Sequence, residues 1–299
     1  MNTKTLILTL LLIAGVVMQN CAPKQKKETA ETLSVSIVPQ KYFVDKLSGE
    51  QIQVNVMIPP GAGHATYSPT ARQFQEMSDS KLYVSMGYLG YEQTWMDRLE
   101  ELNPAMNWLS LSDDLELIRG VEEHGDHIHV GGVDPHIWMS PKVVLQFLPA
   151  LKDAMIQNFP SLKDTIEKNY LHLKKEIEEL DQYTHQVVSN LEQKQFLIFH
   201  PALTYLARDY GLNQISIEQD GKEPSPAFLA SVIQMAKKEN IPVIFIQEEY
   251  DIRNARLISE EAGIHLVQIN PMAYDWLASM RSIVQQLDQY LSVIPQSNL

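Results

Sequence analysis

The sequence predicts an α/β protein in which two doubly wound parallel-sheet lobes are joined by one long spine helix. Three observations lead to this prediction. Short apolar runs alternate with amphipathic segments over residues 33–139, the same alternation returns over residues 194–299, and residues 140–193 between them contain no strand pattern. Alternating strands and helices with short connections favour parallel sheets, and a long periodic segment between two such regions favours a helical linker.

The N-terminal lobe begins with LSVSIVP, whose apolar and polar residues alternate as in a half-buried strand. The strands expected in this lobe cover residues 33–39, 52–60, 81–87 and 106–113. The helices expected between them cover residues 41–50, 68–80 and 89–104. Pro69 stands near the start of the second of these helices, a position where proline is tolerated because its missing N–H is not needed.

The linking region is predicted to be helical throughout. Its longest periodic piece runs from Lys163 to about Asn190, where apolar residues recur near a helical period. These residues are Ile166, Tyr170, Leu173, Ile177, Leu180 and Val187. At ~1.5 Å per residue a helix of this span is about 40 Å long, which suits a spine between two lobes.

The C-terminal lobe repeats the strand–helix pattern. Its expected strands are residues 195–201, 213–218, 242–247 and 265–271. Its expected helices are residues 203–211, 226–240 and 254–263, followed by a closing helix that ends near residue 291. In folds of this kind ligands bind outside the carboxyl ends of the strands, so residues that follow a strand are the first candidates for a site.

Composition narrows the classes of function. The chain has 299 residues, 44% of them hydrophobic, and a formal net charge of −13. This content of apolar residues excludes a disordered chain and is ample for a large core. The acidic balance argues against nucleic acid binding, which needs a basic face, and is compatible with collecting cations.

The N-terminus indicates export and a lipid anchor. Lys4 precedes an apolar stretch over residues 6–18, and Cys21 follows it. The stretch is shorter than the roughly 20 apolar residues that span a bilayer, so residues 1–20 are predicted to be a lipoprotein signal peptide. Cys21 is the only cysteine and therefore has no disulfide partner within the chain, which favours lipidation at Cys21 over an ordinary signal peptide or a short anchor. Residues 21–32 form a polar tether, and the protein is expected at the bacterial cell envelope, facing the periplasm or the exterior.

Three histidines lie at predicted strand ends or in loops beside them: His64, His136 and His200. Imidazoles at the mouths of two α/β lobes can meet across one cleft, and neutral imidazole suits Zn²⁺ at about 2.0–2.1 Å. The alternative, that each is an ordinary surface or capping histidine, stays open on this reasoning. For His172 and His185 on the spine, and for His265, a surface position is the preferred interpretation.

A second group of histidines lies within residues 122–129, which read EEHGDHIH. His124, His127 and His129 stand beside carboxylates, a composition found in metal-binding tracts. Flanking glycines predict a mobile loop, which would bind metal weakly as an auxiliary site and pass ions inward. A solvated acidic loop without a metal role is the alternative.

Several stretches together resemble the zinc- and manganese-binding solute-binding proteins of ABC transporters, the ZnuA-like group. They are PPGAGHATYSPT, MGYLGYEQTWMDRL, DPHIWMSP, NYLHLKKEIEELD, IFHPALTYLARDYGL and GKEPSPAFLASVIQMAKKENIPVIFIQ. The resemblance implies two lobes with a rigid helix, a metal bound by His64, His136 and His200, and an ABC permease as partner. It favours Zn²⁺ over Mn²⁺ or Fe²⁺, because manganese members tend to carry a carboxylate at the third position.

The sequence departs from the family pattern at three places. Two residues separate His64 from Tyr67, where the family has one, and Gln247 and Asn270 stand where the family often has acidic residues. Both replacements remove negative charge near the expected site. The fourth ligand is left open between a water or hydroxide, Glu248, Gln247 and Asn270.

The expected function is capture of Zn²⁺ by a lipid-tethered monomer and its delivery to a membrane permease, without catalysis. Affinity is expected to fall below about pH 6, because a histidine must be neutral to ligate a metal. One alternative is a zinc-dependent hydrolase, in which Glu248 or Glu249 would act on a metal-bound water. The other is an adhesin or scaffold with a structural metal.

Overall fold

The computed structural model describes residues 31–63, 67–124, 127–218 and 224–292, and for residues 97, 102, 121–124 and 127–131 only the backbone. The described residues belong to one compact unit that begins at Glu31. The predicted signal peptide, the lipidation residue Cys21 and the candidate ligand His64 lie outside the described residues. Over the ranges given above, none of the helices has the length and apolar character that crossing a bilayer requires.

The first lobe contains a four-stranded parallel sheet in the order β2-β1-β3-β4. Its strands are β1 (Thr32–Val35), β2 (Gln53–Val56), β3 (Leu82–Ser85) and β4 (Asn107–Ser110). The helices that connect them are α2 (Val38–Ser48), α3 (Ala71–Ser78) and α4 (Gly90–Leu102). All seven elements occur where the sequence predicts them, although the strands are shorter than the predicted runs. Strand β2 stops before Pro59 and Pro60, which have no N–H to continue a ladder.

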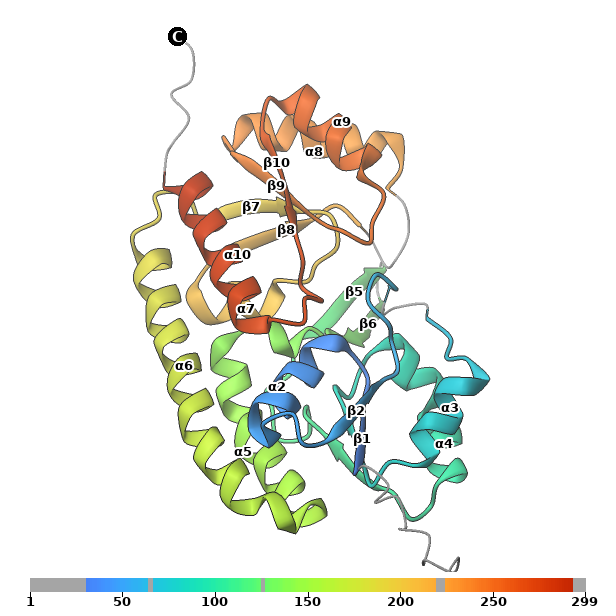
Figure 1. Ribbon diagram of the computed structural model, residues 1–299. Coiled ribbons are helices and arrows are strands. Elements are labelled where there is room, and N and C mark those ends of the chain that lie inside the picture. Colours follow the sequence, from blue (N-terminus) through green and yellow to red (C-terminus); the bar gives the residue numbers. More distant parts are fainter. Residues whose placement is uncertain (1–30, 64–66, 125–126, 219–223, 293–299) are drawn as a thin grey trace, which may run out of the picture. The chain divides into compact units, whose positions relative to one another are not determined.

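The second lobe contains a second four-stranded parallel sheet, in the order β10-β9-β7-β8 (Figure 1). Its strands are β7 (Gln195–Ile198), β8 (Asn213–Ser216), β9 (Val243–Gln247) and β10 (His265–Ile269). Its helices are α7 (Thr204–Tyr210), α8 (Pro226–Lys238), α9 (Ile252–Ala262) and α10 (Trp276–Leu291). Two parallel sheets of doubly wound order confirm the predicted fold class.

The stretch before the linking region differs from its prediction. The sequence predicts a mobile loop over residues 122–129, but the backbone forms β5 (Arg119–His124) and β6 (His127–Val133), which pair antiparallel. The loop prediction was wrong: this stretch contains β-branched residues that favour strands despite the glycines and charges around them, namely Val121, Ile128, Val130 and Val133. The side chains of His124, His127 and His129 lie outside the description, so their metal role stays a prediction.

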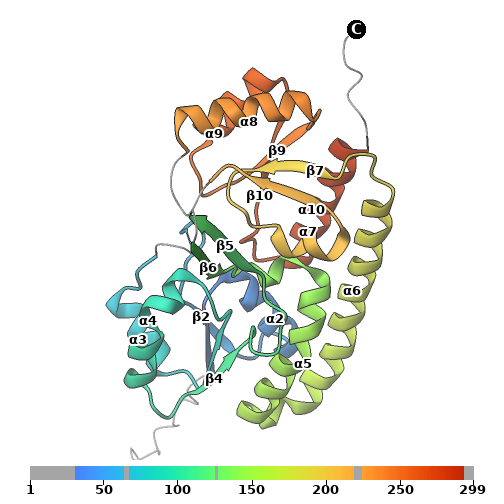
Figure 2. The same cartoon turned by 180° about the vertical axis from the view of Figure 1, so that it is seen from behind.

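The linking region consists of α5 (Pro141–Asn158), a short 3₁₀ turn, and α6 (Lys163–Ser189). Helix α6 has 27 residues, as the periodicity predicts, and runs beside α5 (Figure 2). Its buried face is formed by residues at helical spacing, listed here: Ile166, Leu173, Ile177, Leu180, Thr184, Val187 and Val188. It contacts α2 of the first lobe and α7 and α10 of the second, so one rigid element touches both lobes.

Alternate residues of the second sheet belong to two different cores. On β7, Phe196 and Ile198 pack into a core shared with α6, α10 and the first lobe. Leu197 of β7 and Phe199, the residue that follows the strand, pack into a separate core under α8 and α9. This alternation follows from the two-residue period of a strand. The larger core is continuous from the first sheet to the inner face of the second, which holds the carboxyl ends of both sheets in a fixed unit.

Candidate metal centre

His200 lies two residues after strand β7, at the carboxyl end of the second sheet. Strand β7 is the point where chain order reverses in this sheet, because β8 lies on one side of it and β9 on the other. Side chains that follow such a strand project into the crevice where ligands of doubly wound folds bind. The backbone of His200 is held by Gln247 of β9, whose Nε2 donates to the carbonyl oxygen at 2.6 Å and whose Oε1 accepts from the amide at 3.4 Å.

His136 comes from the connection between the β5–β6 hairpin and α5, just before a 3₁₀ turn at Ile137–Met139. Asp134 stabilises the local conformation, because its Oδ1 accepts from the backbone N–H of His136 at 2.9 Å. The following aromatic residue anchors the segment to the second lobe. Trp138 Nε1 donates to the carbonyl oxygen of Pro271 at 3.0 Å, and Trp276 Nε1 donates to the carbonyl oxygen of Trp138 at 2.7 Å. His136 itself is 2% exposed.

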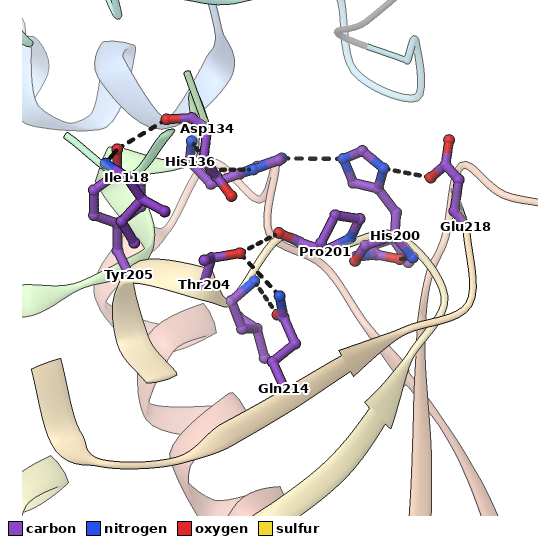
Figure 3. Close-up of polar contacts among 11 residues, drawn as sticks. Ile118, Asp134, His136, His200, Pro201, Thr204, Tyr205, Gln214 and Glu218 are labelled. Atoms are coloured by element: carbon purple, nitrogen blue, oxygen red, sulfur yellow. Dashed lines mark hydrogen bonds and ion pairs between the residues drawn. The ribbon is translucent and has the colours of Figure 1, made fainter. Parts of the chain in front are cut away.

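The two imidazoles point at each other (Figure 3). The Nε2 atoms of His136 and His200 are 3.1 Å apart. Behind each ring stands a carboxylate at the other nitrogen: Nδ1 of His136 lies 2.8 Å from Asp134 Oδ1, and Nδ1 of His200 lies 2.5 Å from Glu218 Oε2. A carboxylate at Nδ1 favours the tautomer whose proton is on Nδ1, so the Nε2 lone pairs converge.

This arrangement is suited to a metal ion. When two nitrogens bind the same tetrahedral Zn²⁺ ion at about 2.0–2.1 Å, they lie about 3.3 Å from each other. The observed separation of the two Nε2 atoms, 3.1 Å, is close to this value. Two converging lone pairs repel each other unless a proton or a cation lies between them, so the pair is suited to hold either one. Carboxylates behind ligating imidazoles are the usual outer partners of metal-bound histidine.

Burial sets the charge state of His136. It lowers the pKa of His136, and the nearby Asp134 carboxylate opposes this effect only in part. Burial by itself would raise the pKa of Asp134, but the charge of His136 and hydrogen bonds from it lower that pKa instead. His136 is therefore a neutral imidazole next to an ionised carboxylate at neutral pH, which is the form that binds metal without first losing a proton.

The candidates for a fourth ligand have different surroundings. Both amide atoms of Gln247 are bonded to the His200 backbone, which makes Gln247 a support for that histidine. Glu248 is exposed, and its Oε2 accepts from Asn270 Nδ2 at 2.9 Å. Glu249 is half-buried, and both glutamates line a cavity of about 440 Å³ that also borders Asn270.

The three histidines that the sequence predicts at surface positions lie apart from this centre. His172 is exposed on α6 and 3.8 Å from Glu176, His185 is exposed on the same helix, and His265 packs against the ring of Tyr290. Among the residues whose placement is described, no three His, Cys, Asp or Glu side chains form a group that could hold a metal ion. The structure thus brings together two of the three predicted ligands, while the third, His64, lies outside the described residues.

Sequence reasoning missed the two carboxylates behind the rings. Asp134 is part of the DPHIW motif and only two residues before His136, which is a local signal. Glu218 follows β8, the strand next to β7, so the same rule of strand ends that pointed to His200 also applies to it. Tyr250, whose ring stacks on His200 with centroids 5.0 Å apart, had no sequence signal.

The fold and the paired imidazoles define a two-lobed α/β binding protein with a spine helix. The chain belongs to the family described as ZnuA, zinc-uptake complex component A, periplasmic, whose model matches residues 34–290. It is 27% identical over 283 residues to the zinc-binding lipoprotein AdcA of Streptococcus pneumoniae, covering 90% of this chain and 55% of that protein. The chain thus spans about half the length of the AdcA relatives that it matches.

Other relatives match over most of their length. The chain is 27% identical over 244 residues to the high-affinity zinc uptake system protein ZnuA of Bacillus subtilis, covering 78% of this chain and 76% of that one. A crystal structure of ZnuA superimposes with a TM-score of 0.80 at 31% identity, covering 88% of this chain and 100% of the other. These matches confirm the family that the sequence motifs indicated.

Proposed function

We propose that this protein captures a divalent transition metal, Zn²⁺ in preference to Mn²⁺ or Fe²⁺, and delivers it to an ABC permease in the membrane. The observation that carries the proposal is the pair of Nε2 atoms 3.1 Å apart with a carboxylate behind each ring. Imidazole ligands suit Zn²⁺ better than Mn²⁺, which prefers oxygen. The zinc-uptake names of the relatives support the same metal.

We assign His64 as the third ligand on the family motif, and Cys21 as the lipid anchor. The name lipoprotein carried by AdcA supports the anchor and an extracytoplasmic location at the cell envelope. A binding role without catalysis fits a family of transport components. The hydrolase alternative has no support from these relatives, and an auxiliary metal site at His124, His127 and His129 stays part of the proposal.

Calorimetric titration of the metal-free protein with Zn²⁺ and with Mn²⁺ tests this proposal. We expect one tight zinc site and much weaker binding of Mn²⁺. Changing His64, His136 and His200 together to alanine should lower zinc affinity by at least the ~10–100-fold that loss of an outer partner alone costs. The matched control is His172→Ala, which removes an exposed imidazole from α6 and should leave affinity unchanged.

Zinc binding of undiminished affinity in the triple variant would contradict the assignment and place the metal elsewhere, with the β5–β6 hairpin as the next candidate. Absence of zinc binding by the unaltered protein would contradict the function itself.

A further inference from the structure

The hydroxyl of Tyr205, on α7, is inserted into the backbone ladder at the base of the β5–β6 hairpin. The pairing of Arg119 with Val133 would place Ile118 opposite Asp134 one step further along. Such a pair exchanges two hydrogen bonds, and one of them is present, since the Asp134 N–H donates to the Ile118 carbonyl oxygen at 2.9 Å. In place of the other, the Ile118 N–H donates to the Tyr205 hydroxyl at 3.2 Å, and this hydroxyl donates to the Asp134 carbonyl oxygen at 2.9 Å (Figure 3).

Helix α7, which carries this hydroxyl, also belongs to the His200 loop. It begins at Thr204, shortly after His200, and Thr204 Oγ1 donates to the carbonyl oxygen of Pro201 at 2.9 Å. Tyr205 is the next residue, is 0% exposed, and bonds to the backbone of the residue that orients His136. One short helix therefore holds the loop of one imidazole and the support of the other.

The far side of the His136 segment is bonded to the same helix. Ser140 Oγ donates to Asp209 Oδ2 at 2.5 Å, and Lys142 Nζ donates to the Asp209 carbonyl oxygen at 2.8 Å. The segment is thus fixed to α7 before His136, by Tyr205, and after it, by Asp209. Because α7 follows His200 directly, these bonds set where one imidazole lies relative to the other.

The inserted hydroxyl has a specific effect on the position of Asp134. Buried backbone N–H and C=O groups need partners, and hydrogen bonds are directional. Without the hydroxyl, the Ile118 N–H and the Asp134 carbonyl oxygen satisfy each other by closing the ladder one step further. This closure draws Asp134 toward Ile118 and away from the place where its carboxylate accepts from His136.

We propose that Tyr205 is a positioning residue of the metal centre, whose hydroxyl fixes Asp134 and thereby the place of His136 relative to His200. This assignment rests on the proposed function and deepens it. Both bonds of the hydroxyl go to backbone groups, so Tyr205 influences metal binding through Asp134 and not as a ligand.

The test compares Tyr205→Phe with Tyr210→Phe in the full chain. Both changes remove one phenol hydroxyl from α7 and keep the ring, but the Tyr210 hydroxyl donates to Asp181 of the spine helix, at 2.6 Å. Calorimetry gives the zinc affinity, and the visible absorption spectrum of the Co²⁺-loaded protein reports the geometry of the ligands. We expect Tyr205→Phe to lower zinc affinity about 3–10-fold, the range of one hydrogen bond, and to change the spectrum. Tyr210→Phe should change affinity less than about twofold and leave the spectrum as it is.

Two further measurements test the route through Asp134. Nitrogen NMR of the metal-free protein reports the tautomer of the His136 ring, and Tyr205→Phe should lower the share that carries its proton on Nδ1. In an Asp134→Ala background, Tyr205→Phe should lower zinc affinity by a smaller factor than in the unaltered protein, because the group that it positions is gone. An unchanged tautomer, or fully additive losses, would contradict this route.

The failures of the two proposals are distinguishable. If the unaltered protein binds no metal, the proposed function fails. If it binds zinc and Tyr205→Phe leaves both affinity and spectrum unchanged, only the role of Tyr205 is overturned. Equal losses in the two tyrosine variants would also overturn it, because they would show a general effect of a weakened helix. Melting temperatures of the metal-free variants are measured first, and all titrations are run at a temperature where both variants are folded.

Discussion

At the scale of single residues, the carboxylates behind the imidazoles orient the site. Asp134 holds the ring of a residue two positions away, so its contact forms within one turn of chain. Glu218 holds His200 from a neighbouring strand, 18 residues further along, at 2.5 Å. Both side chains are mostly buried, with exposed fractions of 15% for Asp134 and 11% for Glu218. Buried carboxylates keep their orientation, and they keep the rings from turning away from each other.

Removal of Glu218 should weaken metal binding without removing a ligand. We expect Glu218→Ala to lower zinc affinity ~10–100-fold, because the His200 ring and its tautomer are no longer fixed. Glu218→Gln should recover part of the loss, since an amide oxygen still accepts from Nδ1. Competition with a chelating dye measures the affinity. The surface change Glu239→Ala in the same lobe is the control, and equal affinities for Glu218→Ala and the unaltered protein would refute the positioning role.

At the scale of elements, the connection from β3 to α4 shows how tightly the strand ends of the first lobe are packed. Glu92, fully buried on α4, accepts hydrogen bonds from the backbone N–H groups of Met86, Gly87 and Leu89. Gly87 has a φ of +110°, and a Cβ atom placed there would lie 1.9 Å from Ser112 Oγ. Only glycine satisfies both conditions, so the path of this connection depends on it.

Substitution of Gly87 should therefore destabilise the fold more than substitution of another glycine with positive φ. Gly263 has a φ of +72° but open space around it. We expect Gly263→Ala to lower the free energy of unfolding by about 1 kcal/mol, the cost of the left-handed conformation alone. Gly87→Ala should cost a further ~1–3 kcal/mol for the steric conflict. Urea unfolding of both variants measures the difference, and equal losses would contradict the packing described here.

At the scale of the whole described unit, one apolar core runs from the first sheet through α6 to the inner face of the second. Aromatic contacts connect the lobes directly: Phe43 of α2 lies 5.1 Å from Trp276 of α10 between ring centroids. Tyr274 donates a hydrogen bond to Asp45 of α2 at 2.7 Å. Wide opening of the lobes would expose this core to water, at about 25 cal/mol for each Å² of apolar surface.

We therefore expect zinc binding to produce a small closure and local ordering. Small-angle X-ray scattering of metal-free and zinc-loaded protein should give radii of gyration that agree within experimental error. The change Tyr274→Phe, which removes the hydrogen bond to Asp45 and keeps the ring, should not alter this result. A large decrease in the radius on zinc binding would show a hinge that the continuous core does not allow.

The fold class, the strands and helices of the two sheets, and His136 and His200 as candidate ligands could be predicted from the sequence. Periodicity decides which face of a segment is buried, so α6 and the eight strands of the two sheets could be located from it. His136 and His200 could be found because their signals are local: a motif, and a position after an apolar strand. The β5–β6 hairpin could not, because flanking glycines and charges outweighed its short β-branched pattern.

Which carboxylate stands behind His200 depends on the tertiary structure. Glu248 and Glu249 are neighbours in sequence and chemically identical, yet one is exposed and the other half-buried. The contact of Glu218 with His200, and the use of Gln247 as a backbone support, likewise depend on how strands from distant parts of the chain are aligned. Distances between side chains on different elements follow from sheet twist and packing, which no local pattern of residues encodes.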